Sequence, residues 1–223
     1  MIKFILTLPF VLLLVSCSDD SVMSEPLSKN DVILTFGDSL TYGYGAGSLD
    51  NSYPSKLEEI TGYTVINAGI NGDTAKAAGN RINDLISKHS PSLVLIGLGG
   101  NDMLRKNDKN LKDDLNSIIH QFQSNNIKVV LLAMPKPQLN LIGQRLSDYE
   151  LYNEIANEND VFLIENTFSK YLSNNSYKSD MIHLNAEGYG LVAKDIAEVL
   201  EEKGFIKYSK WQLKLNAKLF YFK

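Results

Sequence analysis

The stretch TFGDSLTYGYGAG, residues 35–47, overlaps and extends the apolar run Val32–Phe36. A short apolar run is typical of a buried strand, and glycine, aspartate and serine after it are typical of a turn. The same turn places Ser39 at the end of that strand. The stretch therefore predicts either an ordinary turn or a loop that presents a serine nucleophile.

Similar apolar runs alternate with longer amphipathic segments along the chain. The expected strands are Val32–Phe36, Tyr63–Asn67, Leu93–Leu98, Lys128–Ala133 and Val161–Ile164. The expected helices are Tyr53–Thr61, Thr74–Lys88, Asn110–Asn125, Leu146–Asn159 and Ala186–Lys203. This alternation predicts an α/β fold with a parallel sheet and helices on both faces.

Length and composition limit the possible classes of protein. The chain has 223 residues, of which 44% are hydrophobic, and this suits one domain with a sizeable core. A net charge of −4 without a basic stripe argues against a nucleic-acid partner. The single cysteine, Cys17, excludes an intramolecular disulfide framework and a cysteine-rich zinc site.

The first residues, MIKFILTLPFVLLLVSC, have the features of a signal peptide: Lys3 precedes an apolar segment that is short for a membrane span. The end of this stretch resembles a bacterial lipobox. We therefore expect a signal peptide over 1–16, acyl chains on Cys17, a tether over 17–29, and a protein anchored in the cell envelope on a periplasmic or outer-membrane face. The alternative is an ordinary secretory signal.

The expected domain spans 30–204 and is followed by a basic extension over 205–223. The tail alternates apolar and polar residues, as a half-buried strand does. A packed extension, a hairpin arm, a membrane-facing patch and a disordered end all fit this pattern.

Four polar segments are expected at one edge of the sheet, because ligands of open parallel sheets bind beyond the carboxyl ends of the strands. Three of them follow strands, and the fourth precedes the last helix. They are GDSL (37–40), NAGINGDT (67–74), GGND (99–102) and DMIH (180–183).

These segments contain the groups that acyl transfer needs. His183 is the candidate base for Ser39, and Asp180 lies close enough in sequence to orient its ring. His89 and His120 do not follow a strand on this side. The N–H groups of Ser39 and Gly72 and the amide of Asn101 are candidate oxyanion donors, whereas Asp38 is expected to cap local N–H groups.

Read alone, these residues also fit a surface histidine, turn glycines and an Asx-turn. The segments GDSLTYGYG, NAGINGDT, GLGGND and DMIHLNAEGY, in this order, resemble the SGNH, or GDSL-type, hydrolase family. The resemblance is to its bacterial arylesterase and lysophospholipase/thioesterase I-like branch, and it runs from Asp31 to Leu200.

This resemblance implies a flavodoxin-like three-layer α/β/α fold with sheet order 2-1-3-4-5. It implies a Ser39–His183–Asp180 triad, with oxyanion donors at Ser39, Gly72 and Asn101, and no metal or cofactor. The chain departs from many members at Leu184, where they have proline. The G-x-S-x-G elbow of α/β-hydrolases is absent around Ser39.

We therefore expect a monomeric serine esterase acting on a small-molecule ester, thioester or lysophospholipid. Segment 134–146 is expected to line the acyl or alcohol side. The alternatives are a carbohydrate O-acetylesterase on the same fold and, less favoured, a non-catalytic envelope binding protein.

Overall fold

Five short strands form one all-parallel sheet. The computed structural model describes residues 25–137 and 145–208. The strands are β1 (Val32–Gly37), β2 (Thr64–Gly69), β3 (Leu93–Gly97), β4 (Lys128–Leu132) and β5 (Phe162–Ile164). Their order is β2-β1-β3-β4-β5, which confirms the expected fold class and strand order.

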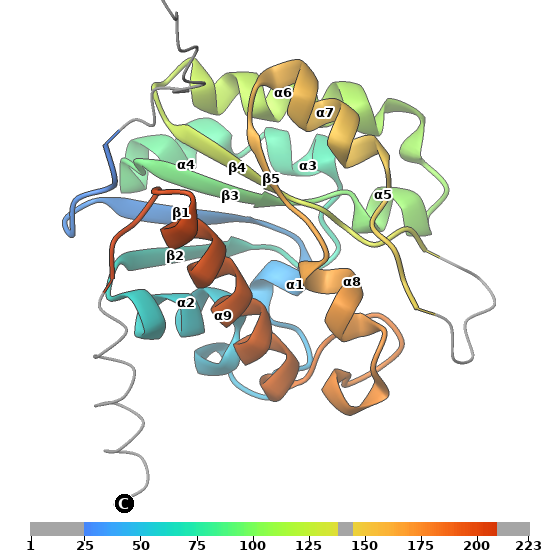
Figure 1. Ribbon diagram of the computed structural model, residues 1–223. Helices are drawn as coiled ribbons and strands as arrows, with labels where there is room; N and C mark the ends of the chain where they lie inside the picture. The colour runs from blue at the N-terminus through green and yellow to red at the C-terminus, as the bar shows by residue number, and fades with distance from the viewer. Residues whose placement is uncertain (1–24, 138–144, 209–223) are drawn as a thin grey trace, which may run out of the picture.

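Helices cover both faces of the sheet (Figure 1). One face carries α2 (Tyr53–Thr61) and α9 (Ala186–Glu202), which pack on each other. The other face carries α3 (Ala75–Gly79), α4 (Ile82–His89), α6 (Leu111–Gln123) and α7 (Leu151–Asn159). The remaining helices lie at the carboxyl end of the strands: α1 (Ser39–Tyr42), α5 (Gly100–Leu104) and α8 (Thr167–Leu172). Three 3₁₀ turns complete the described elements: η1 (Leu49–Asn51), η2 (Asp108–Asn110) and η3 (Asn175–Tyr177).

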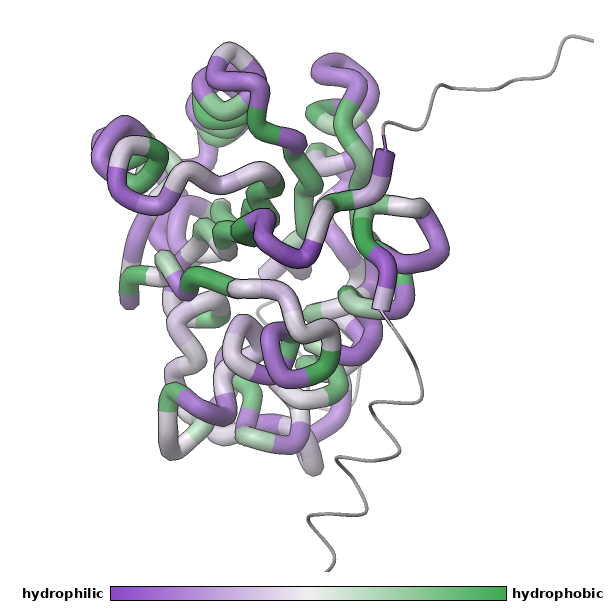
Figure 2. Tube along the Cα trace, turned by 90° about the vertical axis from the view of Figure 1, so that its left-hand side faces the viewer, coloured by the Kyte–Doolittle hydropathy of each residue, from purple (hydrophilic) through white to green (hydrophobic). Residues whose placement is uncertain are grey.

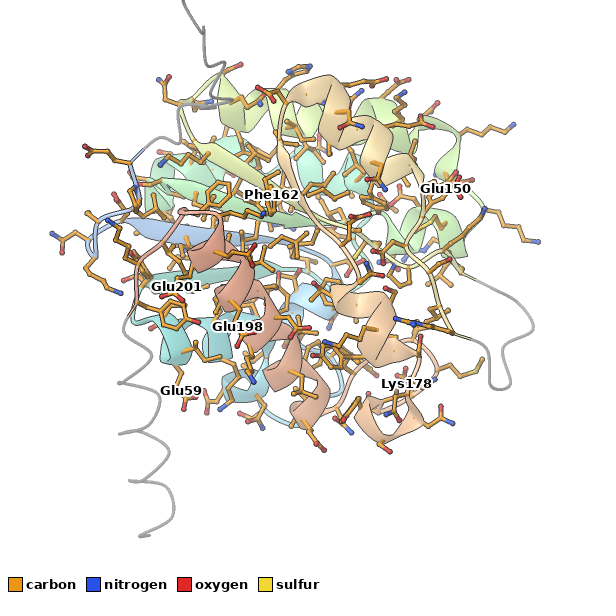
Figure 3. All side chains as sticks on the ribbon, in the orientation of Figure 1. Glu59, Glu150, Phe162, Lys178, Glu198 and Glu201 are labelled. Carbon is orange, nitrogen blue, oxygen red and sulfur yellow. The ribbon has the colours of Figure 1, made fainter. Side chains whose placement is uncertain are left out.

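The core lies between the sheet and its two helical layers. Every residue of β3 is buried, as its uninterrupted apolar sequence predicts for a central parallel strand. Phe36 of β1 meets Phe122 of α6 edge to face, with ring centroids 5.4 Å apart. Hydrophobic segments gather at the centre of the molecule (Figure 2). Charged side chains lie outside it: Glu59 and Glu198 are on the exposed sides of α2 and α9 (Figure 3).

Two predicted helices are shorter than expected. The segment 74–88 is two helices, because the chain turns at Asn80 and Arg81, where the Arg81 N–H donates to Ala78 O. The segment 146–159 becomes helical only at Leu151. Residues before it pair with the chain that leaves β4, and the Tyr149 N–H donates to Met134 O. Tertiary contacts override helical propensity at both places.

The last helix agrees with prediction almost to the residue. The Asn185 side chain accepts a hydrogen bond from the Gly188 N–H, and Gly204 follows the C-cap with a left-handed backbone. The short helices α5 and α8 were not expected. Both have few residues, and α8 is covered by α9, so their apolar periodicity is too short to recognise.

The two ends of the described chain lie side by side at the amino-terminal end of the strands (Figure 1). The Leu27 N–H donates to Phe205 O at 2.9 Å, and Tyr63 OH donates to the carbonyls of Leu27 and Lys207. Cys17, most of segment 134–146 and the tail beyond Tyr208 lie outside the described residues. Between residues 25 and 208, none of the described helices has the length and apolar character needed to cross a bilayer.

Candidate active site

The carboxyl ends of β1, β2 and β3 bring three of the four polar segments to one edge of the sheet, and the loop before α9 completes the site. The Ile70 N–H donates to Gly37 O, which ties the segment after β2 to the end of β1. The fourth segment begins after Lys178, labelled in Figure 3, and is closed by a β-bridge between Lys178 and Leu184.

Ser39 is the first residue of α1 because Asp38 caps that helix. The Asp38 carboxylate accepts a hydrogen bond from the Leu40 N–H at 3.0 Å, as expected. A side chain at Gly69 would overlap the backbone nitrogen of Tyr42, so α1 approaches the end of β2 only because residue 69 is glycine. The strand, cap and close approach together fix the position of Ser39.

Ser39, His183 and Asp180 form one chain of hydrogen bonds. His183 Nε2 lies 3.0 Å from Ser39 Oγ, and His183 Nδ1 lies 2.7 Å from Asp180 Oδ2. Because a carboxylate only accepts hydrogen bonds, Nδ1 carries the hydrogen, and Nε2 is then free to accept the hydroxyl hydrogen of Ser39. The structure thus brings together the three residues that the sequence selected.

The Asp180 carboxylate is held by backbone as well as by His183. Its Oδ1 accepts hydrogen bonds from the N–H groups of Ile182 and His183, at 2.9 and 2.8 Å. Partial desolvation acts to raise the pKa of Asp180, but the hydrogen bonds from the His183 ring and these two N–H groups outweigh it. The pKa of Asp180 is therefore below its ordinary value, and the group stays ionised at neutral pH.

The candidate oxyanion donors differ in whether they already donate hydrogen bonds within the protein. Within the described residues, no hydrogen bond uses the N–H of Ser39 or of Gly72. The Asn101 amide, in contrast, donates to Asp73 O at 3.0 Å and to Asp38 Oδ2 at 3.3 Å. Its two hydrogens are thus occupied, the second at a longer and weaker distance.

Asp38 is a buried carboxylate beside the candidate nucleophile, with 2% of its surface exposed. Its pKa is raised to about 7. Burial is the main cause, the nearby carboxylates of Asp102 and Asp73 add to the rise, and the hydrogen bond from the Leu40 N–H opposes it. Asp102 is equally buried and accepts the N–H of Ala75 at the start of α3.

Arg81, which sequence analysis did not select, ties the strand ends together. Its guanidinium donates to Ala68 O at 2.8 Å, to Gly37 O at 3.1 Å and to Asp73 Oδ2 at 3.0 Å. It also lies over the Phe36 ring. The expected continuous helix over 74–88 would have made Arg81 an ordinary surface residue, so the sequence offered no signal for this position.

Four exposed apolar residues lie close in sequence to the polar groups of the site, and we call them the rim. They are Ile70, Leu104, Met181 and Ile182, with exposed fractions of 47, 46, 88 and 44%. His89 and His120 lie on α4 and α6, away from this edge, as expected. Within the described ranges, no three His, Cys, Asp or Glu side chains are grouped so as to hold a metal ion.

Comparison with known proteins identifies the family and several relatives of this chain. Residues 35–191 match the model of the GDSL-like Lipase/Acylhydrolase family. The chain is 30% identical over 187 residues to an arylesterase of Vibrio mimicus, covering 80% of this chain and 92% of that protein. It is also 30% identical over 177 residues to thioesterase 1/protease 1/lysophospholipase L1 of Escherichia coli K12, covering 77% of this chain and 84% of that protein.

Solved structures share the fold. The psychrotrophic esterase EstA from Pseudoalteromonas sp. aligns with a TM-score of 0.69 at 24% identity, over 78% of this chain and 98% of that chain. AlinE4, an SGNH-hydrolase family esterase, aligns with a TM-score of 0.60 at 29% identity, over 79% of this chain and 97% of that chain. The protein is thus an ester-hydrolysing enzyme with an α/β/α fold. It belongs to the GDSL-like lipase/acylhydrolase family.

Proposed function

We propose that the protein is a serine esterase that hydrolyses carboxylic esters and thioesters through an acyl-enzyme. Ser39 is the nucleophile, His183 the general base and acid, and Asp180 the group that orients the imidazole. The observation that carries this proposal is the unbroken chain from Ser39 Oγ to His183 Nε2 at 3.0 Å and from Nδ1 to Asp180 at 2.7 Å.

In the first half of the reaction, Ser39 Oγ attacks the acyl carbonyl carbon and its proton passes to His183 Nε2. The carbonyl oxygen becomes an oxyanion, and the unused N–H groups of Ser39 and Gly72 are available to stabilise it. Asn101 becomes a third donor when its amide exchanges the 3.3 Å hydrogen bond to Asp38 for the oxyanion. The ionised Asp180 stabilises the imidazolium that forms.

The tetrahedral intermediate then collapses, and the bond between the acyl carbon and the alcohol or thiol breaks. The leaving group takes the proton from His183, which leaves Ser39 acylated. A water molecule then attacks the acyl-enzyme while His183 accepts its proton, and release of the carboxylic acid returns the proton to Ser39 Oγ.

The rim favours apolar substrates over acetylated sugars. Ile70, Leu104 and Met181 offer apolar surface beside the site, and the relatives named above are an arylesterase and a thioesterase/lysophospholipase. A chain-length series of p-nitrophenyl esters and a lysophospholipid tests this point. We expect turnover of medium or long acyl chains, whereas activity confined to acetate would identify an O-acetylesterase.

Labelling by a fluorophosphonate probe, with mass mapping of the labelled peptide, tests the nucleophile. We expect the label on Ser39 and none on the Ser39→Ala variant, which should lose hydrolysis while keeping its melting temperature. Ser176→Ala, an exposed serine elsewhere in the chain, is the matched control. Substantial turnover by Ser39→Ala would remove Ser39 from this role.

We also propose that Cys17 carries a lipid anchor that holds the enzyme on an envelope membrane. The support is the apolar segment before Cys17 and the lipobox-like residues around it. Cys17→Ala should move the protein from the membrane to the soluble fraction, whereas Ser16→Ala, which keeps the thiol, should not. Unchanged partitioning of Cys17→Ala would contradict the anchor.

A further inference from the structure

The segment after α1 contains a tyrosine and two glycines, and the chemistry above does not use them. Gly43 ends α1 with a left-handed backbone, and Tyr44 follows it. The Tyr44 ring lies against the His183 ring, with centroids 4.5 Å apart and planes tilted by 47°. Tyr44 is 49% exposed, so its own burial does not account for this placement.

The backbone of Tyr44 is fixed from two sides. Its N–H donates to Ser39 O at 3.0 Å, so one contact goes to the candidate nucleophile itself. Its carbonyl accepts a hydrogen bond from Tyr189 OH at 2.8 Å, and Tyr189 is fully buried in α9, the helix that follows His183. Tyr44 thus connects Ser39, the candidate nucleophile, with the helix that follows His183.

Gly45 allows this segment to lie directly on the loop that contains Asp180 and His183. Its backbone is left-handed, with φ of +86°, and an added Cβ would collide with Ser179 Oγ and lie 2.8 Å from Leu184 O. Ser179 and Leu184 flank the Asp180–His183 segment on either side. The Ser179 N–H also donates to His183 O. Gly45 therefore packs where the two ends of the Asp180–His183 loop meet.

We propose that Tyr44 and Gly45 are positioning residues that hold the His183 imidazole in the plane in which Nε2 faces Ser39. Asp180 and Ser39 hold the ring through its two nitrogens, and these in-plane hydrogen bonds leave the ring free to tilt about the line that joins them. The Tyr44 ring closes one face of the imidazole and removes this freedom. The proposal rests on the function proposed above for Ser39 and His183.

The ring contact is tested by Tyr44→Ala and Tyr44→Phe. Within the described residues the Tyr44 hydroxyl makes no hydrogen bond, so phenylalanine keeps the contact and alanine removes it. We expect alanine to lower kcat about 10- to 100-fold with little change in KM, because small displacements of a reacting group cost this much. Phenylalanine should recover most of the wild-type kcat.

The rate of Ser39 labelling by the fluorophosphonate should fall together with kcat in Tyr44→Ala. Undiminished kcat and labelling in that variant, while Ser39→Ala is inactive, would overturn the positioning role and leave the triad intact. An effect confined to KM would also overturn it, because the ring would then contact substrate. Labelling absent from wild-type Ser39 would instead reject the triad itself.

The backbone contact has a matched pair of variants. Gly45 and Gly47 both have left-handed backbones, with φ of +86° and +78°, but an added Cβ at Gly47 meets nothing within 4 Å. Both alanine variants therefore carry similar backbone strain, and only Gly45→Ala should reduce kcat, about tenfold. Equal kcat in the two folded variants would reject a role for Gly45. If Gly45→Ala does not fold, the Tyr44 pair decides the proposal.

Discussion

The site has two sides that are built differently. The strand-end side, comprising Asp38, Gly72, Asn101 and Arg81, is rooted in the sheet, and its carboxylate Asp38 is 2% exposed. The loop side carries Asp180 and His183 on a short segment before α9, and the Asp180 side chain is 43% exposed. The strand-end side cannot shift without breaking sheet and core contacts, whereas the loop side is held by a few local hydrogen bonds and the Tyr44 contact.

This difference separates activity from stability. Changes on the loop side should affect catalysis and leave folding nearly unchanged. Changes on the strand-end side should affect both, because the same groups hold the ends of β1, β2 and β3 together. Three substitutions and one control variant test this division.

Asp180→Asn has the largest expected effect. The amide keeps the shape of the carboxylate but favours the wrong tautomer of His183, and this costs up to about 10⁴-fold in kcat in comparable triads. Because the side chain is 43% exposed, its ionised carboxylate contributes little stability, and the melting temperature at neutral pH should fall only slightly. A large fall in the melting temperature, or full activity, would contradict the division between the two sides.

Arg81→Gln should lower both activity and stability. It removes donors to two strand-end carbonyls and leaves the half-buried Asp73 carboxylate without its ion pair, at a cost on the order of 2 kcal/mol in the free energy of unfolding. We expect kcat to fall about 10- to 100-fold through displacement of the oxyanion donors. Urea unfolding and steady-state kinetics measure the two effects.

Arg105→Gln is the matched control for stability, since Arg105 makes one exposed hydrogen bond to Gly72 O. The midpoint of its urea unfolding transition should be nearly the same as that of the wild type. Equal destabilisation by the two variants would show that the buried network around Arg81 has no special importance.

Asp38→Asn has the smallest expected effect on kcat, and we expect it to act on the pH dependence of stability. The pKa of Asp38 is raised to about 7, so the folded state keeps this proton while the unfolded state loses it above about pH 4. Wild-type stability relative to Asp38→Asn should therefore fall as the pH rises from about 4 to about 7. Urea titrations at several pH values measure this difference.

The stability difference between the wild type and Asp180→Asn should change with pH in the opposite direction, because of the Asp180 carboxylate of the wild type. This carboxylate has a lowered pKa, so the stability it contributes is present above about pH 4 and is lost as the pH falls through the lower folded-state value. The same slope for both variants would contradict the contrast between the two sides.

Much of the fold could be predicted from local patterns. The centres of all five strands and the boundaries of α9 follow from apolar runs, capping and a terminal glycine. The prediction of one continuous helix over 74–88 was wrong, because the helix is interrupted where the Arg81 side chain turns toward the strand ends. Its partners are carbonyls of β1 and β2, far away in sequence, so no local pattern could report them.

The candidate site divides in the same way. Ser39, Asp180 and His183 were found because each adjoins an element end and has a side chain suited to one chemical step. The hydrogen bond from Asn101 to Asp38 and the contact of Tyr44 with His183 each join segments that are far apart in the sequence. Spacing along the chain carries no information about either contact.

The pairing of Leu27 with Phe205, at the far end of the strands from Ser39, makes the two ends of the described domain suitable for engineering. Fusion partners, purification tags or a solid support attached beyond either end would leave the mouth of the site pointing outward. The same proximity allows a domain trimmed near Leu27 and Tyr208 to be joined by a short linker and reopened in a surface loop, giving a circularly permuted esterase.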